Sequence, residues 1–257
     1  MSAIAIRDNN YNYYTKKRPI FTLKERIEPK LAADGSEKKT HSNAVVGVSN
    51  KTYAIKNEEV LSAYIRYYES RKNDSLDDMR KYVLIMFELC TGLRVSDVIG
   101  TTWGDLMLTG CRYREFIRVR QKKTSKYGEF GINDLLRTVL DDYKNMLIEY
   151  FGTFDLDWYL FPSNGKCGYI TRQTAWNWCN LGAKESGIEL SVGNHGLRKT
   201  FGYTSMQTHR DDAMFLATLM RIFGHTSERI TLAYCGIDED DNRQLYSDVA
   251  SAYAKLL

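Results

Sequence analysis

The sequence lacks the features that mark membrane proteins, disulfide-rich secreted domains and metal sites. Its 257 residues contain no apolar run long enough to span a bilayer, and the N-terminus has no apolar signal-peptide core. The five cysteines are scattered, odd in number and without C-x-x-C spacing, which argues against a disulfide framework or a zinc site. No internal repeat, P-loop or H-E-x-x-H motif occurs. We therefore expect a cytoplasmic protein with no membrane association, no metal and no other cofactor.

The net charge is only a weak indication of nucleic-acid binding, and the distribution of charge along the chain says more. The net charge is +4, but residues 1–52 hold ten Lys or Arg against five Asp or Glu, whereas residues 236–257 hold two against five. The basic and aromatic segment 1–52 is either an arm that follows a phosphate backbone or a solvated tail and linker. We expect residues 53–257 to form the main domain.

Hydrophobic periodicity predicts a mostly helical domain with a small antiparallel sheet, an α+β fold. Cap residues and apolar spacing indicate helices over residues 56–70, 75–92, 133–150 and 171–187. Residues 103–121 are the strand-rich part, with apolar and basic residues alternating roughly every second position over 114–120. A turn at 124–128 leads to a short third strand near 129–132. The long helices predict the core, and the hairpin predicts the sheet.

The run from residue 193 to 234 carries the first sign of function. Asn194 is a plausible N-cap, which would put His195 and Arg198 on one face of a first helical turn. Two basic residues at a helix N-terminus oppose the helix dipole and have no stability rationale there. An anion bound between their side chains would supply one.

A second histidine and a tyrosine follow at further helix ends. Gly224 is typical of a helix C-terminus, which leaves His225 on a connection. Thr226 or Ser227 would cap a short helix that reaches Tyr234 and stops at Gly236. Polar side chains at helix ends can meet a ligand, although each one alone is more often a solvated or core residue.

The combination of H-x-x-R, then G-H, then a tyrosine nine residues later resembles the tyrosine recombinase (phage integrase) family. The resemblance implies that His195, Arg198, His225 and Tyr234 are catalytic, with Tyr234 as the nucleophile. Upstream, T-G-L-R at residues 91–94 resembles the first arginine motif of the family. It implies a catalytic Arg94, and Asp97 stands where the family usually has Glu and would orient the arginine. In the family a lysine of the hairpin, often followed by Thr, reaches the scissile phosphate. The K-K-T at residues 122–124 therefore implies that Lys123 is this catalytic lysine, with Lys122 as the alternative.

The resemblance implies strand exchange between two specific sites on double-stranded DNA. Tyr234 would form a 3′-phosphotyrosyl bond, Lys123 would protonate the leaving 5′-oxygen, and the two arginines would hold the phosphate. The implied assembly is a synaptic tetramer, with accessory DNA-bending or directionality factors, in a bacterial, phage or mobile-element setting. Further DNA contacts are expected from Lys122, Lys126, Lys199 and Arg229.

Two alternatives remain open from the sequence. A DNA-binding regulator could keep the recombinase fold without strand exchange, and segment 1–52 is shorter than the domain that usually precedes the catalytic one. A type IB topoisomerase would use similar chemistry without paired sites. The C-terminal residues 242–257 should form a helix with Leu245, Val249, Ala252 and Leu256 on one face, docked on a neighbouring subunit or packed in cis. Tyr246 and Tyr253 on this tail compete with Tyr234 as nucleophile.

Overall fold

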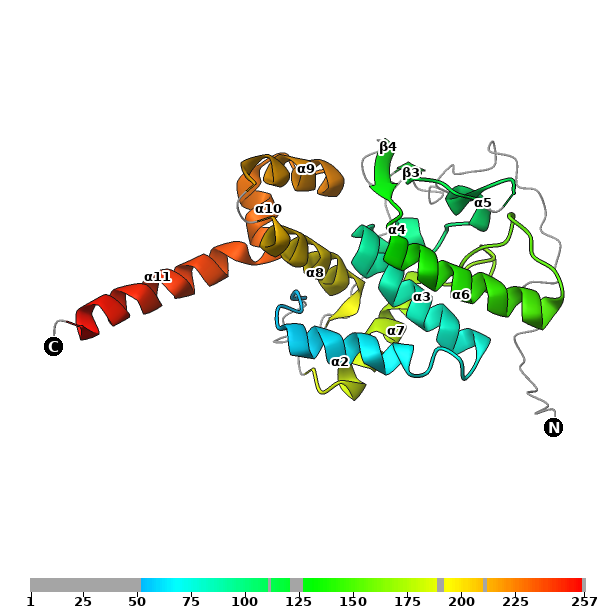
Figure 1. Cartoon of the computed structure of the whole chain (residues 1–257), viewed down its shortest axis with the longest axis horizontal. Helices are drawn as coiled ribbons and strands as arrows, with labels where there is room; N and C mark the ends of the chain where they lie inside the picture. The colour runs from blue at the N-terminus through cyan, green and yellow to red at the C-terminus, as the bar shows by residue number, and fades with distance from the viewer. Residues whose placement is uncertain (1–51, 111, 121–126, 189–191, 210–211, 256–257) are drawn as a thin grey trace, which may run out of the picture. The chain divides into compact units, whose positions relative to one another are not determined.

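The computed structural model describes residues 52–110, 112–120, 127–188, 192–209 and 212–255 (Figure 1). These residues belong to one compact unit, Thr52–Leu257. Its helices are α2 Glu58–Glu69, α3 Leu76–Thr91, α4 Val95–Val98, α5 Trp103–Leu106, α6 Asp134–Phe151, α7 Arg172–Glu185, α8 Gly193–Thr208, α9 Ala213–Phe223, α10 Glu228–Cys235 and α11 Ile237–Ala254. Its strands are β1 Met107–Leu108, β2 Arg112–Tyr113, β3 Phe116–Arg120 and β4 Tyr127–Gly131. The predicted fold class, mainly α with small antiparallel sheets, is confirmed.

Helix α3 is the centre of the packing, with α2, α6 and α8 against it. Ser75 caps its start by accepting a hydrogen bond from the Asp78 amide (3.0 Å), as the sequence predicts. Its apolar residues are buried at helical spacing, among them Met79, Val83 and Met86. The helix ends at Gly92, whose φ of 59° is left-handed. Position 92 also has no room for a side chain, because an added Cβ would lie 2.3 Å from the Phe201 ring.

The start of α8 differs from the prediction. Asn194 is not the N-cap: α8 begins at Gly193, and Val192 precedes it without a side-chain capping bond. The Asn194 amide instead points into the core, where Nδ2 donates to both carboxyl oxygens of Glu88 on α3 (2.9 and 3.2 Å). An unsatisfied buried carboxyl costs more free energy than a helix end that water can solvate. The Asn194 side chain therefore bonds the distant Glu88 and does not cap its own helix.

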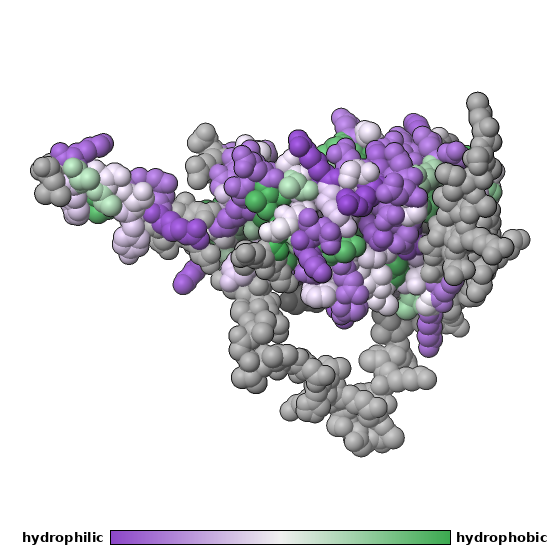
Figure 2. Space-filling view, turned by 90° about the horizontal axis from the view of Figure 1, so that it is seen from below, coloured by the Kyte–Doolittle hydropathy of each residue, from purple (hydrophilic) through white to green (hydrophobic). Residues whose placement is uncertain are grey.

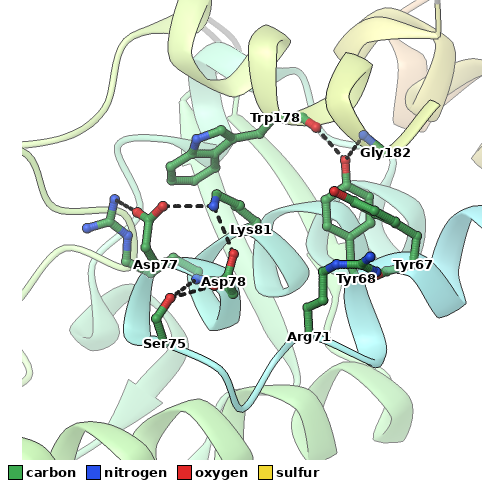
Figure 3. A network of polar contacts seen from close by, with 10 residues as sticks. Tyr67, Tyr68, Arg71, Ser75, Asp77, Asp78, Lys81, Trp178 and Gly182 are labelled. Carbon is green, nitrogen blue, oxygen red and sulfur yellow. Dashed lines mark hydrogen bonds and ion pairs between the residues drawn. The ribbon is translucent and has the colours of Figure 1, made fainter. Parts of the chain in front are cut away.

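Helix α7 approaches α2 closely at Gly182 (Figure 3). The Gly182 amide donates to the Tyr68 hydroxyl (2.8 Å), and that hydroxyl donates to the Trp178 carbonyl. A Cβ on Gly182 would lie 2.2 Å from the Tyr68 ring, so only glycine fits. To the left of this contact in the view, Lys81 of α3 pairs with Asp77 and Asp78 near the start of the same helix (Figure 3).

The hairpin β3–β4 matches the prediction in kind, although helix α5 occupies residues expected to be part of the strand-rich region. Ile117 pairs with Phe130 on the buried face, and Arg118 pairs with Glu129 across the exposed face (2.8 Å). Thr102 and Asp105 form a reciprocal capping box that starts the short α5. The hairpin tip, residues 121–126, lies outside the described residues, and so do Lys122, Lys123 and Lys126.

The C-terminal helix begins earlier than predicted. Gly236, with φ 75°, ends α10, and α11 starts at the next residue. Tyr246, Val249 and Tyr253 are exposed on α11, and Figure 2 shows green apolar surface among purple hydrophilic surface along this helix, at the left of the view. Leu256 and the side chains of Leu245 and Ala252 lie outside the described residues, so the choice between cis and trans packing stays a prediction.

Candidate active site

Arg94 lies just after the turn that ends α3. The left-handed Gly92 reverses the chain, and Arg94 becomes the residue preceding α4. Its Nη2 donates to the carbonyl of Phe223, the last residue of α9 (2.9 Å). The carbonyls at a helix C-terminus lack intrahelical donors and carry partial negative charge, so a guanidinium is a favourable partner for them.

Arg198 of α8 joins the ends of the same two helices. It is 2% exposed, and it donates to the Gly92 carbonyl through Nη1 and to the Phe223 carbonyl through Nη2 (3.2 Å). Its guanidinium also lies 4.4 Å from the centre of the Phe223 ring. Burial, reinforced by the nearby Arg94 cation, lowers the pKa of Arg198 to about 10, and Tyr234 and Asp97 act against that decrease.

Tyr234 of α10 lies beside these two arginines. Its ring packs edge-on against Phe223 (5.2 Å between ring centres). The hydroxyl oxygen is buried, and Arg198 is the cation that interacts with it most strongly. Burial raises the pKa of Tyr234, while the positive charges of Arg198 and Arg94 oppose the rise by attracting a phenolate.

Both histidines contact the Tyr234 ring. The ring centre of His225 lies 5.1 Å from that of Tyr234, and the ring centre of His195 lies 5.7 Å from it. His195 is exposed on α8, whereas His225 follows the left-handed Gly224 and is half-buried. His225 Nδ1 bonds the Thr231 hydroxyl (3.0 Å), which donates to the Ser227 carbonyl (3.4 Å). In that arrangement Nδ1 carries the proton and Nε2 is the acceptor.

The structure therefore brings five of the predicted catalytic residues together: Arg94, His195, Arg198, His225 and Tyr234. Asp97 is buried nearby and raises the pKa of Arg198, so its charge acts on Arg198. The sixth residue, Lys123, lies outside the described residues. The catalytic roles themselves stay predictions.

Of the basic residues predicted to contact DNA, the structure describes Lys199 and Arg229. Arg229 is exposed on α10. Lys199 donates to the Thr52 carbonyl (2.6 Å), and its Nζ lies 5.5 Å from the centre of the Tyr234 ring. The sequence reasoning missed this second contact, although the position of Lys199 next to Arg198 in H-x-x-R-K was a usable signal.

The described residues contain no group of three or more His, Cys, Asp or Glu side chains arranged to hold a metal ion. Within the same ranges, none of the helices has both the length and the apolar character that crossing a membrane requires.

Comparison with known proteins identifies the family. The profile described as Phage integrase family matches residues 57–240. The chain is 32% identical over 167 residues to the probable integrase/recombinase YoeC of Bacillus subtilis (strain 168), which covers 65% of this chain and 83% of YoeC. It is 29% identical over 151 residues to the tyrosine recombinase XerD of Shewanella oneidensis, with 58% of this chain and 47% of XerD covered.

Solved structures agree on the fold. The XerA recombinase matches with a TM-score of 0.57 and 20% identity, over 79% of this chain and 66% of XerA. The XerH site-specific recombinase, in a post-cleavage complex with palindromic difH substrate, matches with a TM-score of 0.56 and 19% identity, over 72% of this chain and 50% of XerH. The chain thus spans about half the length of XerD and XerH. From the family profile and the match to YoeC, the chain belongs to the phage integrase family and has the catalytic-domain fold of a tyrosine recombinase.

Proposed function

We propose that this protein cleaves and rejoins DNA strands through a covalent bond between Tyr234 and a 3′-phosphate. One observation carries the proposal: the Tyr234 hydroxyl is buried close to Arg198 and Arg94, and both guanidiniums lower its pKa against the effect of burial. Two cations beside a tyrosine hydroxyl form a site for the anionic phosphate that the hydroxyl would attack.

The arginines bind and orient the scissile phosphate. Their bonds to helix-terminal carbonyls fix the direction of each guanidinium before DNA arrives. Preorganised donors stabilise the charge that develops on the non-bridging oxygens, because they need no reorganisation during the reaction. The negative charge of Asp97 favours the protonated form of Arg198.

The transesterification replaces the phosphodiester bond of DNA with a phosphotyrosyl ester, so the energy of the bond is kept for rejoining. The Tyr234 oxygen attacks phosphorus, the bond between phosphorus and the 5′-oxygen breaks, and the electron pair leaves with that oxygen. His195 accepts the phenol proton, since its ring contacts the Tyr234 ring. Lys123 protonates the 5′-oxygen. His225, once it has taken up a second proton at Nε2, donates a hydrogen bond from that nitrogen to the phosphate. Attack by a 5′-hydroxyl on the phosphotyrosyl bond reverses these steps and rejoins a strand.

The wider assignment follows the relatives. YoeC is called a probable integrase/recombinase, XerD a tyrosine recombinase, and XerH is described in complex with a palindromic DNA substrate. We accordingly propose double-stranded DNA with paired sites as the substrate, a synaptic tetramer as the active assembly, and a cytoplasmic setting in a bacterium, phage or mobile element. Accessory DNA-bending or directionality factors belong to the same proposal.

A nicked suicide substrate tests the chemistry. The short fragment between the cleavage site and the nick diffuses away, which prevents religation. The wild-type protein should therefore accumulate as a covalent DNA complex. Tyr234→Phe should bind the same DNA and form no complex, while Tyr246→Phe and Tyr253→Phe should trap normally. Mapping of the adduct to Tyr246 or Tyr253 would overturn the assignment of the nucleophile.

A further inference from the structure

The segment of residues 52–56, which leads into α2, lies directly on α8. In Figure 1 it is the blue trace at the start of α2. The Ile55 amide donates to the Thr200 hydroxyl (2.8 Å), and Lys199 donates to the Thr52 carbonyl (2.6 Å). A Cβ added to Gly196 would lie 2.8 Å from the Tyr53 carbonyl oxygen, so the two backbones touch. The segment is thereby fixed to the helix that carries His195 and Arg198.

The end of this segment reaches the helix that carries Tyr234. Lys56 Nζ donates to the Gly236 carbonyl (2.7 Å), and Gly236 terminates α10 two residues after Tyr234. A Cβ at Gly236 would lie 3.0 Å from Lys56 Cε, so the lysine stem packs closely on this turn. A cation at a helix C-terminus interacts favourably with the helix dipole. The same ammonium group lies 5.4 Å from the centre of the Tyr203 ring on α8.

We propose that Lys56 is a positioning residue for Tyr234, holding the C-terminal turn of α10 against α8. The inference rests on the proposed function, in which Tyr234 is the nucleophile. Apart from its interaction with Arg198, the Tyr234 side chain is positioned by its ring contacts and by the helix that carries it. The Lys56–Gly236 bond fixes that helix two residues away. It also joins the helix of the nucleophile to the segment of residues 52–56.

The test compares Lys56→Met with the wild type in the full chain. Methionine keeps an apolar stem and loses the donor. We expect single-turnover cleavage of the nicked substrate to slow by about tenfold, because a small displacement of a reacting group costs that much or more. Equilibrium binding of the same DNA should be unchanged. Lys56→Arg keeps a donor and should recover most of the rate, and Lys184→Met, on the exposed end of α7, is the matched control.

Amide hydrogen exchange in the free protein separates positioning from general stability. Lys56→Met should speed exchange at Tyr234, Cys235 and Gly236 and leave the buried amides of α3 unchanged. Equal acceleration in α3, unchanged cleavage, or a loss of DNA affinity that accounts for the rate would each overturn the inference. If the wild-type protein forms no covalent complex, the proposed function fails, and the exchange measurement still decides whether Lys56 holds α10.

Discussion

Arg94 and Arg198 donate to the same acceptor, the carbonyl oxygen of Phe223, at 2.9 and 3.2 Å. The first arginine follows α3 and the second belongs to α8, so one carbonyl at the end of α9 aligns two cations from distant parts of the sequence. Two like charges this close repel each other, and the Arg94 cation contributes to the lowered pKa of Arg198. A bound phosphate anion would relieve that repulsion.

Replacement of either arginine by alanine should abolish cleavage, but the two changes should differ in stability. Arg198→Ala leaves the buried Gly92 carbonyl without its arginine donor, which should lower the free energy of unfolding by about 1–3 kcal/mol. Arg94→Ala should cost less, because Phe223 still accepts from Arg198. Urea denaturation of both variants and of the double variant measures the costs. Equal losses for the two single variants would contradict the arrangement.

Glu88 provides a pH-dependent prediction. Its carboxyl is fully buried, and burial raises its pKa well above the ordinary value of 4.5, against the Asn194 hydrogen bond that lowers it. The folded protein therefore keeps a proton that the unfolded chain loses. The stability associated with this proton is complete below pH 4.5 and decreases as pH rises toward the folded-state pKa.

Glu88→Gln should remove that dependence. Glutamine keeps an oxygen that accepts from Asn194, and it never ionises. The free energy of unfolding of the variant should therefore rise relative to that of the wild type between pH 5 and 8. The expected rise is about 1.4 kcal/mol for each unit of the Glu88 pKa shift that falls within this window. Urea denaturation at several pH values measures the difference. Glu88→Leu, which cannot accept from Asn194, is the control for the hydrogen bond. A constant difference between Glu88→Gln and wild type across this range would show that Glu88 is already ionised.

Local signals explain why much of this fold was predictable. The caps at Ser75, Asn133 and Thr171 and the left-handed glycines at 92, 224 and 236 depend on neighbours within a few residues, so the sequence displays them. The spacing of the histidines, arginines and tyrosine also identified the cluster. Periodicity located the buried face of α3 for the same reason.

Long-range contacts account for what the sequence did not show. The local sequence favours a cap at Asn194, because its partner Glu88 is 106 positions away and the pattern around Glu88 indicates only a core helix. The Lys56–Gly236 bond joins residues that are 180 positions apart, so no periodic pattern in the sequence indicates it. The early start of α11 follows from Gly236, which ends one helix and begins the next, whereas the sequence suggested a separate tail.

The exposed face of α11 should act in assembly. Val249→Glu puts a charge among Tyr246 and Tyr253, and burying that charge between subunits would be costly. We expect weaker synapsis on paired sites and unchanged binding to a single site, with deletion of residues 248–257 giving the same result. Ser251→Glu, on the opposite side of the helix, is the matched control. Native gels with one-site and two-site DNA measure both, and intact synapsis in Val249→Glu and in the deletion would exclude docking through this face.

Lys123 should be the general acid for the leaving 5′-oxygen. If it only contacts phosphate, Lys123→Ala should weaken DNA binding and reduce its salt dependence slightly. If it donates the proton, binding should hold while cleavage falls by roughly 10²–10⁴-fold, the usual value of such a transfer. Gel-shift titrations at several salt concentrations and single-turnover cleavage separate the two roles.

A substrate with sulfur in the 5′-bridging position isolates the proton transfer. A thiolate leaves without protonation, so this substrate should restore cleavage to Lys123→Ala. It should not restore cleavage to Arg198→Ala, because the anchoring of the phosphate by a guanidinium is still required. Rescue of Lys122→Ala in place of Lys123→Ala would move the role one residue upstream. If sulfur rescues neither lysine variant, the acid is a different group, and His195 or Lys199 beside Tyr234 would be the next to replace.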